Sequence, residues 1–273
     1  MRGDVTPTAS GGHETEHTLI GGTANRGLVV RVGDTVRRPL RPASASTHAL
    51  LVHLEAVGFS GAPRLLGIDA QGREVLTFVE GEAVLPPYPL WGLTDESLVS
   101  VAHLLRDFHD ATVDFGGDAL TWSAWLPEPF HTGGVISHND PNLDNIVFRE
   151  GRAVALIDFD LSAPGSRVWD VACAARLWAP LRSDADIDDA RRGQSMSRFR
   201  RFVDAYGVAH EDRVKVVDAV ATTHVWCYDV VTEGAERGNA NFAEYWQATG
   251  AARADRTQSW LEQEHQTMRA ALG

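Results

Sequence analysis

Hydrophobic and polar positions in the first 80 residues follow the two-residue period of short β-strands, interrupted once by a helical pattern. The strand-like runs are predicted at 28–32, 35–38, 64–68 and 74–79. Gly33-Asp34 suits a tight hairpin turn between the first two runs. Residues 46–57 carry leucines at helical spacing. The pattern therefore predicts a β-β-α-β-β unit, a small sheet with one helix.

Beyond Gly81 the pattern becomes mainly helical. Thr94 is a good N-cap for a helix whose apolar face runs from Leu98 to Phe108. Residues 127–145 are predicted as loop, and a hairpin that turns at Glu150-Gly151 follows them. Further helices are predicted at 168–179, 187–206, 212–232 and 241–271.

These patterns predict an α+β fold with two lobes. Residues 1–17 are small and polar, which predicts a disordered N-terminal arm. Residues 18–80 would form the β-rich N-terminal lobe. Residues 81–273 would form the larger, mainly helical lobe.

Composition excludes several classes of protein. No apolar run approaches the roughly 18 residues that a membrane span needs. The first residues lack the apolar core of a secretory signal, and two cysteines cannot build a disulfide scaffold. We therefore expect a cytoplasmic protein with no membrane partner.

The net charge of −12 is carried entirely by residues 81–273, since 8 arginines balance 8 acidic residues in positions 1–80. Such an acidic lobe would repel a phosphate backbone, so we expect no nucleic-acid partner. It would attract a cationic small molecule, although solubility alone is a sufficient reason for acidity.

The segment from His138 to Asn145 carries the strongest candidate chemistry, together with Asp158. Asp140 and Asn145 lie in a turn-rich loop before the predicted hairpin, and the far strand of that hairpin returns Asp158 to the same loop. The three side chains can therefore converge. They offer one carboxylate for a substrate hydroxyl, and a carboxylate with an amide oxygen for a hard cation such as Mg²⁺. Phosphoryl transfer needs such a set; three turn residues without a function are the alternative.

The motif His138-x-Asp140-x-x-x-x-Asn145, followed by Asp158, resembles the catalytic loop and metal-binding strand of the aminoglycoside phosphotransferase family, which has the protein-kinase-like fold. The resemblance implies ATP or GTP and Mg²⁺ as cofactors. It assigns Asp140 as the catalytic base, Asn145 and Asp158 as magnesium ligands, and His138 as a scaffold residue of the loop. Asp160 would lie close to the metals.

The resemblance covers most of residues 18–180. The residues that would contact the nucleotide are Gly21, Gly22 and Asn25 in an opening strand-turn-strand, and Thr77 and Val79 in the hinge. Asp170 is similar to the aspartate that caps a helix and braces the catalytic loop of the family.

The chain departs from this pattern at the phosphate-binding lysine. Kinase-like enzymes carry that lysine on the third strand, paired with a glutamate of the next helix. The only lysine here is Lys215, which also excludes a Walker A loop. We predict that Arg37 replaces the missing lysine, because a guanidinium also binds phosphate well. His48 and Glu55 are the candidates to face it.

The acceptor is expected to bind among the C-terminal helices. Trp226, Asp229 and Glu233 lie on one predicted helix. With Asp160 they would form an acidic, aromatic wall that suits a hydroxylated acceptor, either cationic or sugar-like. Core aromatics with solvated acids are the alternative.

Three functional hypotheses follow from these residues. The first is a magnesium- and nucleotide-dependent phosphotransferase that acts on a hydroxyl of a small molecule such as an antibiotic. The second is a kinase-fold binding or immunity protein with weak or no catalysis, which the missing lysine favours. The third is a biosynthetic, sugar or amino-alcohol kinase. The oligomeric state is left open.

Overall fold

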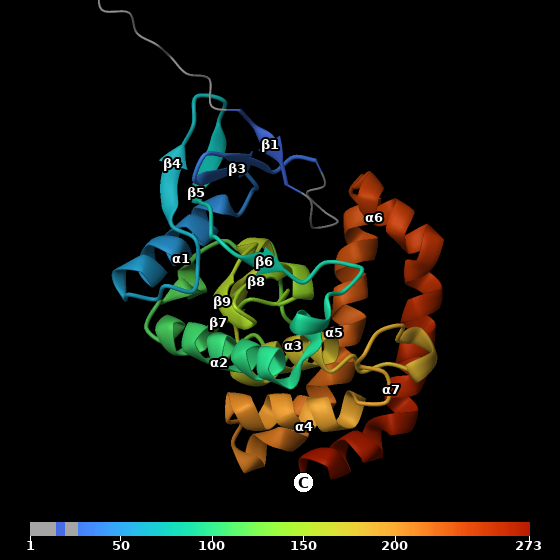
Figure 1. The fold of residues 1–273 in the computed structure, drawn as a ribbon. Coiled ribbons are helices and arrows are strands. Elements are labelled where there is room, and N and C mark those ends of the chain that lie inside the picture. Colours follow the sequence, from blue (N-terminus) through green and yellow to red (C-terminus); the bar gives the residue numbers. More distant parts are fainter. Residues whose placement is uncertain (1–14, 20–26) are drawn as a thin grey trace, which may run out of the picture.

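The computed structural model describes residues 15–19 and 27–273 (Figure 1). Nearest the N-terminus is a five-stranded antiparallel sheet with strand order β1-β2-β3-β5-β4, accompanied by helix α1. Its elements are β1 His17–Thr18, β2 Val30–Val32, β3 Thr35–Pro39, α1 Ser44–Ala56, β4 Leu65–Ile68 and β5 Arg73–Thr77. The predicted β-β-α-β-β order is confirmed, with β1 added before it.

The predicted arm falls mostly outside the described residues. Its last residue, His17, pairs with Arg31 of β2. The carboxylate of Glu16 accepts hydrogen bonds from Arg73 at 2.8 and 3.3 Å. An arm that extends to residue 17 is therefore wrong, because the sheet and an ion pair hold this end of it.

The remainder of the chain is mainly helical, and its short strands lie between the first sheet and the lower helices (Figure 1). One small sheet has the order β6-β8-β9, and β7 pairs with β10. The strands are β6 Glu82–Ala83, β7 Val135–Ser137, β8 Ile146–Arg149, β9 Arg152–Leu156 and β10 Ala163–Gly165. The helices are α2 Asp95–Thr112, α3 Arg167–Trp178, α4 Ser195–Tyr206, α5 His210–Glu236, α6 Ala240–Tyr245 and α7 Ala251–Leu272.

Three predicted segments differ from the structure. The predicted loop at 127–145 contains β7. The helix predicted from residue 187 begins only at Ser195, because the preceding residues form turns in which Asp189 accepts the backbone N–H of Arg191 at 2.9 Å. The last predicted helix is divided into α6 and α7 by a π-helical turn at Trp246–Gly250.

Helix α2 supplies the support for the segment that follows β9. Its predicted apolar face, from Leu98 to Phe108, is buried, and Thr94 caps it by accepting the N–H of Ser97 at 3.1 Å. The ring of Phe108 packs on that of Phe159 with centroids 5.7 Å apart. Phe159 follows Asp158 directly, so this packing fixes the position of a candidate metal ligand.

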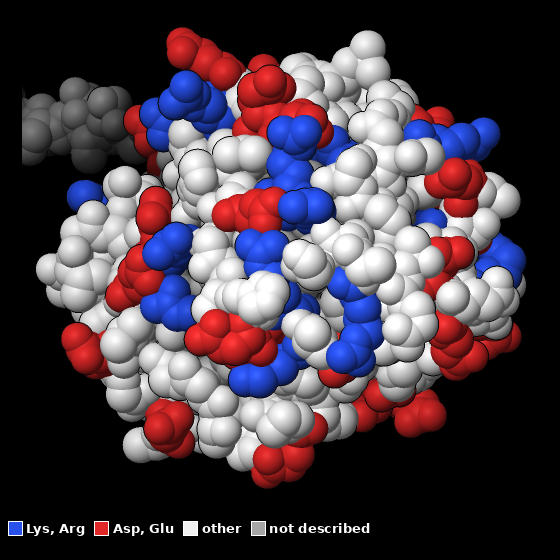
Figure 2. Space-filling model, turned by 90° about the horizontal axis from the view of Figure 1, so that it is seen from below, with Lys and Arg blue, Asp and Glu red and all other residues white. Residues whose placement is uncertain are grey.

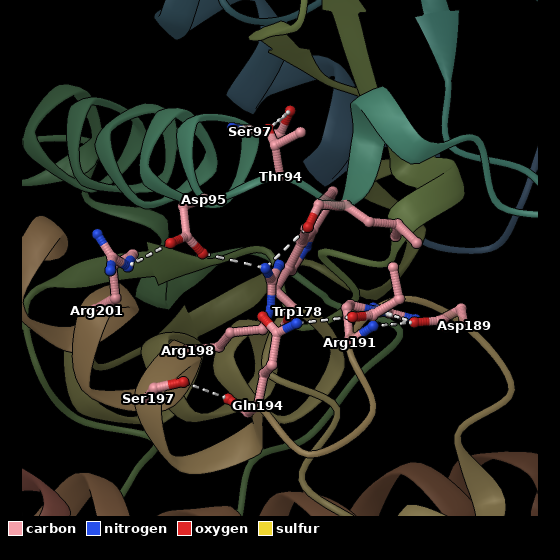
Figure 3. A network of polar contacts seen from close by, with 12 residues as sticks. Thr94, Asp95, Ser97, Trp178, Asp189, Arg191, Gln194, Ser197, Arg198 and Arg201 are labelled. Atoms are coloured by element: carbon pink, nitrogen blue, oxygen red, sulfur yellow. Dashed lines mark hydrogen bonds and ion pairs between the residues drawn. The ribbon is translucent and has the colours of Figure 1, made fainter.

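Two buried arginines connect the helices of the lower part of the molecule (Figure 3). Arg198 of α4 donates to the carbonyl of Trp178 at the end of α3, at 3.1 Å, and to that of Leu93 before α2, at 2.9 Å. Arg191 donates to both carboxylate oxygens of Asp189 at 2.9 and 2.7 Å. These bonds fix the loop between α3 and α4, which borders the cavity described below.

The lower face of the molecule mixes acidic and basic side chains (Figure 2). Ion pairs also join α4 to neighbouring helices: Arg201 pairs with Asp95 of α2 at 3.1 Å, and Arg213 of α5 with Asp204 at 2.7 Å. None of the helices in the described part of the chain is both long enough and apolar enough to cross a membrane.

Candidate active site

Asp170, in the first turn of α3, organises the backbone of the loop that begins at His138. Its carboxylate accepts the backbone N–H groups of His138 at 2.7 Å and Asn139 at 2.8 Å, and Nε2 of His109 lies 3.0 Å away. Burial raises the pKa of Asp170, but the hydrogen bond and charge of His109 outweigh it and hold the pKa below its ordinary value. The predicted capping role is wrong, because Ser166 is the N-cap that accepts the N–H of Trp169.

His138 and Asn139 connect this loop to the segment after β9. Nε2 of His138 lies 3.1 Å from the carbonyl oxygen of Ile157, and burial lowers its pKa, which favours a neutral ring. Asn139 adopts φ +68° and donates through its side chain to the carbonyl of Leu161 at 2.6 Å. His138 is thus a buried link between two segments.

Asp140, Asn145 and Asp158 line one cavity of about 500 Å³. The side-chain amide of Asn145 donates to both the carbonyl and the carboxylate of Asp140 at 2.9 Å, and Asn142 donates to the second carboxylate oxygen. The backbone N–H of Ile157 donates to the carbonyl of Asn145 at 2.9 Å, which brings Asp158 beside the loop. The convergence expected from the sequence is therefore present.

The pKa of Asp140 is raised towards neutral pH. Burial and then the charges of Asp158 and Asp144 raise its pKa to about 7. A carboxylate in this range is a better proton acceptor than an ordinary aspartate, because its basicity is closer to the operating pH.

Arg38, the neighbour of the predicted Arg37, lies at this site. Its guanidinium contacts three carboxylates: Glu74 at 2.5 Å, Asp158 at 2.9 Å and Asp160 at 2.9 Å. Although burial lowers the pKa of Arg38, those charges raise it above its ordinary value, so the guanidinium is always charged. Arg37 instead pairs with Asp69 at 3.6 Å, because successive side chains of a strand point to opposite faces.

The carboxylate partner of this arginine also differs from the prediction. Glu74 belongs to β5 and lies directly opposite Arg38 in the register of the sheet. His48 of α1 contacts the other oxygen of Glu74 at 2.6 Å. Glu55 pairs with Arg64 at 3.4 Å, with both side chains partly exposed. The glutamate that kinase-like enzymes take from a helix is therefore replaced here by one from the adjacent strand.

The donor set fits a magnesium ion held jointly with phosphates. Asn145 uses its amide N–H groups on Asp140, which leaves its amide oxygen for a cation. One oxygen of Asp158 contacts Arg38, and the residue lines the cavity. The described residues contain no group of three or more His, Cys, Asp or Glu side chains able to hold a metal by themselves. Mg²⁺ does not need one, since it commonly combines one or two protein oxygens with water and substrate phosphates.

The predicted nucleotide contacts are tested only in part. Gly21, Gly22 and Asn25 lie outside the described residues. The backbone N–H and the hydroxyl of Thr77 both contact Arg64. The N–H donates to the Arg64 carbonyl at 2.9 Å, and the hydroxyl accepts the Arg64 N–H at 2.8 Å. Thr77 therefore has no free backbone donor for a base. Val79 lies in the segment that joins β5 to β6.

Gly81 completes that connecting segment. It has φ +144°, and a side chain there would collide with the backbone carbonyl of Phe148 in β8. Only glycine allows the connection to approach the small sheet so closely.

The predicted acidic wall is present only in part, because Asp160 lines the cavity whereas Asp229 and Glu233 do not, and four arginines line it as well. Trp226 does line the cavity, and its Nε1 donates to the carbonyl of Trp125 at 2.7 Å. Asp229 is not among the lining residues, and Glu233 pairs with Arg237 at 2.7 Å. The cationic side chains that line the cavity are Arg176, Arg182, Arg191 and Arg253. They come from α3, the following loop and α7, so no single sequence segment reveals them.

Replacing Asp170 with alanine should destabilise the protein strongly. Asp170→Ala leaves two buried backbone N–H groups and His109 without their acceptor, and we expect a loss of roughly 3–5 kcal/mol in the free energy of unfolding. Urea denaturation measures this loss. Asp107→Ala, on the exposed side of α2, is the control and should change the free energy by less than about 0.5 kcal/mol. Equal losses in the two variants would contradict the bracing role.

Known structures share this fold. A choline/ethanolamine kinase family protein from Mesorhizobium loti superposes with a TM-score of 0.65 at 17% identity, covering 98% of this chain and 95% of that one. The gentamicin complex of APH(2")-IIa gives 0.59 at 16% identity, covering 90% and 93%. The choline kinase LicA from Streptococcus pneumoniae gives 0.59 at 13% identity, covering 91% and 93%. The fold is thus protein-kinase-like, of the kind found in small-molecule kinases.

Sequence comparison identifies the family. Residues 117–217, which include the loop of Asp140 and the segment of Asp158, match the model of the phosphotransferase enzyme family, APH. The chain is also 35% identical over 266 residues to the trifolitoxin immunity protein of Rhizobium leguminosarum bv. trifolii, covering 94% of this chain and 98% of the relative. The chain belongs to the aminoglycoside phosphotransferase family.

Proposed function

We propose that this protein is a magnesium-dependent phosphotransferase that moves the γ-phosphoryl group of ATP or GTP to a hydroxyl of a small molecule. The observation that carries the proposal is the convergence of Asp140, Asn145 and Asp158 in one cavity, beside a buried arginine. Phosphoryl transfer is catalysed mainly by positioning and by neutralising charge, and these groups are suited to both tasks.

Arg38, Asn145 and Asp158 would hold the nucleotide phosphates and magnesium. When bound, Mg²⁺ supplies positive charge against the phosphate oxygens. Arg38 presents its guanidinium from the N-terminal sheet to the same site, in the role that lysine has in kinases. Gly21, Gly22 and Asn25 would cover the phosphates, and the backbone at Val79 would receive the base.

Asp140 would act as the base. It accepts the proton of the acceptor hydroxyl while the oxygen of that hydroxyl forms a bond to the γ-phosphorus. The bond between this phosphorus and the β–γ bridging oxygen breaks, and a nucleoside diphosphate leaves. Asn142 and Asn145 keep the carboxylate of Asp140 oriented through their amide groups. The neutral His138 and the charged Asp170 maintain the loop.

The test is nucleotide turnover by the purified protein. ATP and GTP are each supplied with Mg²⁺ and with aminoglycosides, amino-alcohols, sugars and hydroxy acids as acceptors, and nucleoside diphosphate is measured. We expect magnesium-dependent release with at least one acceptor class above the rate without acceptor. Release that is unaffected by chelation of magnesium would contradict the proposal. We further propose that this reaction takes place in the cytoplasm, where both nucleotides are present.

A second candidate function is immunity to a toxin. The relative named as a trifolitoxin immunity protein covers 94% of this chain at 35% identity. Each nitrogen of the Arg38 guanidinium already contacts a carboxylate, so phosphate binding must displace or share one of these partners. A protein that binds a toxin without catalysis would not need to release Arg38 from these carboxylates, so the arrangement is also consistent with that function.

Expression in a toxin-sensitive bacterium separates the two candidates. If protection persists in the Asp140→Asn variant, the protein protects by binding alone. If protection is lost while the variant remains folded, immunity depends on phosphoryl transfer.

A further inference from the structure

We propose that the acceptor carries an anionic group, a carboxylate or a phosphate, and that Arg176, Arg182 and Arg253 bind it in the cavity that Asp140 and Asp158 also line. This inference deepens the proposed phosphotransferase function and rests on it for the identity of the bound molecule as an acceptor. It replaces the cationic acceptor that the chain's net charge had suggested.

The three arginines lack an acidic side chain in direct contact in the described part of the chain, although the charge of Asp140 acts on Arg176 and that of Asp189 on Arg182. None of them forms an ion pair there, and the buried Nε atoms of Arg176 and Arg182 have no hydrogen-bond partner among the described residues. A shortage of acidic residues is not the reason, because the chain has 37 Asp and Glu against 25 Lys and Arg. A guanidinium that faces a cavity without a carboxylate offers a fork of donors that matches carboxylate and phosphate oxygens.

Two neighbouring arginines, unlike Arg182 and Arg253, form direct ion pairs. Arg191 borders the same cavity. Its guanidinium pairs with Asp189 at 2.7 Å (Figure 3) and lies 5.2 Å from the ring centre of Tyr88. Arg256 of α7 pairs with Asp186 at 2.8 Å. The acidic side chains of this region are therefore in direct ion pairs with other arginines, and Asp186 and Asp189 act on Arg182 and Arg253 only at longer range.

The positive charges of these arginines repel one another. Burial and then the positive charges of Arg253 and Arg191 lower the pKa of Arg182 to about 10. Crowding of like charges around a partly buried group is unfavourable in the free protein. An anion placed among these side chains would relieve the repulsion, so binding should also stabilise the fold.

Side chains of both charges line the cavity. Asp140, Asp144, Asp158 and Asp160 line this space of about 500 Å³ together with Arg176, Arg182, Arg191 and Arg253. This volume is in the range of small-molecule sites. A molecule with an anionic group at one end and a hydroxyl at the other would be oriented with the hydroxyl towards Asp140.

Aromatic side chains also line the cavity. The rings belong to Tyr88, Trp226, Tyr228, Phe242 and Tyr245. Rings of this kind pack against the carbon skeleton of a ligand. A cationic acceptor could contact these rings too, but it would meet the arginines at close range, and no carboxylate of Asp229 or Glu233 lines the cavity to offset them.

The experiment compares compounds that share a hydroxylated three- or two-carbon skeleton and differ in charge. Glycerate, glycerol 3-phosphate, glycerol and ethanolamine are titrated into the nucleotide-free protein at constant ionic strength, with binding followed by calorimetry and thermal shift. Each is then tested as an acceptor with Mg²⁺ and ATP or GTP. Glycerate and glycerol 3-phosphate distinguish a carboxylate site from a phosphate site.

The variants are Arg182→Gln and Arg253→Gln, with Arg200→Gln on the exposed face of α4 as the matched control. We expect at least one anionic probe to bind about tenfold more tightly than glycerol or ethanolamine. Each cavity variant should weaken that binding by about tenfold or more, whereas the control should leave it unchanged. Arg176 is left intact, because its charge also acts on Asp140.

Three results would overturn the inference: tighter binding of ethanolamine, no binding of any anionic probe, or cavity variants that raise KM for the nucleotide and leave anion binding unchanged. The last result would assign the arginines to the nucleotide phosphates. Arginine-dependent anion binding without nucleotide turnover would support the anion site and reject the phosphotransferase function, so the two failures are distinguishable.

Discussion

Asp140→Asn is expected to reduce kcat for phosphoryl transfer by about 10²- to 10⁴-fold while the protein stays folded and binds Mg-nucleotide. The change keeps the size of the side chain and one oxygen acceptor for Asn142 or Asn145, but it removes the group that takes the hydroxyl proton. Stability should not fall, because the negative charges of Asp158 and Asp144 disfavour the ionised form of this buried carboxyl. Steady-state kinetics, with unfolding in urea as a second readout, measures both effects.

Asp107→Asn is the matched control, since this exposed residue of α2 makes the same chemical change far from the cavity. Its kcat should equal that of the unmodified protein. A kcat for Asp140→Asn within tenfold of the unmodified value would remove Asp140 from the role of base.

Arg38→Met should lower the free energy of unfolding by roughly 3–5 kcal/mol and abolish nucleotide binding. The substitution leaves Glu74 buried without its 2.5 Å partner, and it leaves Asp158 and Asp160 close together without their shared cation. Arg37→Met is the control on the same strand. Its loss should be below about 1 kcal/mol, because Arg37 is partly exposed and lies 3.6 Å from its acidic partner.

Arg38→Lys separates charge from geometry. An ammonium restores the positive charge but cannot contact three carboxylates through a planar fork. We expect unfolding free energy and nucleotide affinity between those of the arginine and methionine forms. If Arg37→Met and Arg38→Met have equal effects, the assignment of Arg38 to the phosphate site is wrong.

Local features of the fold were predictable because neighbouring residues determine them. The apolar face of α2 and its Thr94 cap depend on spacing within one helix, and the loop of Asp140 is a contiguous motif. Short strands were harder to predict from the sequence. β6 and β7 contain two and three residues, and they exist because β8 and β10, distant in the chain, pair with them.

The arginine that we propose to bind phosphate shows a different limit of prediction from sequence. Arg37 and Arg38 are identical residues in adjacent positions of one strand, and only the pairing of β3 with β5 determines which of them faces Asp158. A prediction that selects the wrong one of these two neighbours places the functional side chain on the opposite face of the sheet. The same pairing supplies Glu74, whose role in the site no local pattern indicates.

The arginines that line the cavity could not be predicted from the net charge of the chain. A net charge of −12 suggested a cationic acceptor, whereas Arg182 and Arg253 lie 71 positions apart in the sequence and meet only in the folded chain. Charge totals describe the whole surface, and the acceptor responds to the few side chains that line its cavity.

Calorimetric titration of non-hydrolysable ATP and GTP analogues into the full chain, with and without Mg²⁺, tests the central claim most directly. We predict one site per chain for at least one analogue, with affinity that falls at least tenfold when magnesium is removed and again in Asp158→Asn. Absence of binding by both analogues in the presence of Mg²⁺ would contradict a nucleotide site between the N-terminal sheet and the loop of Asp140.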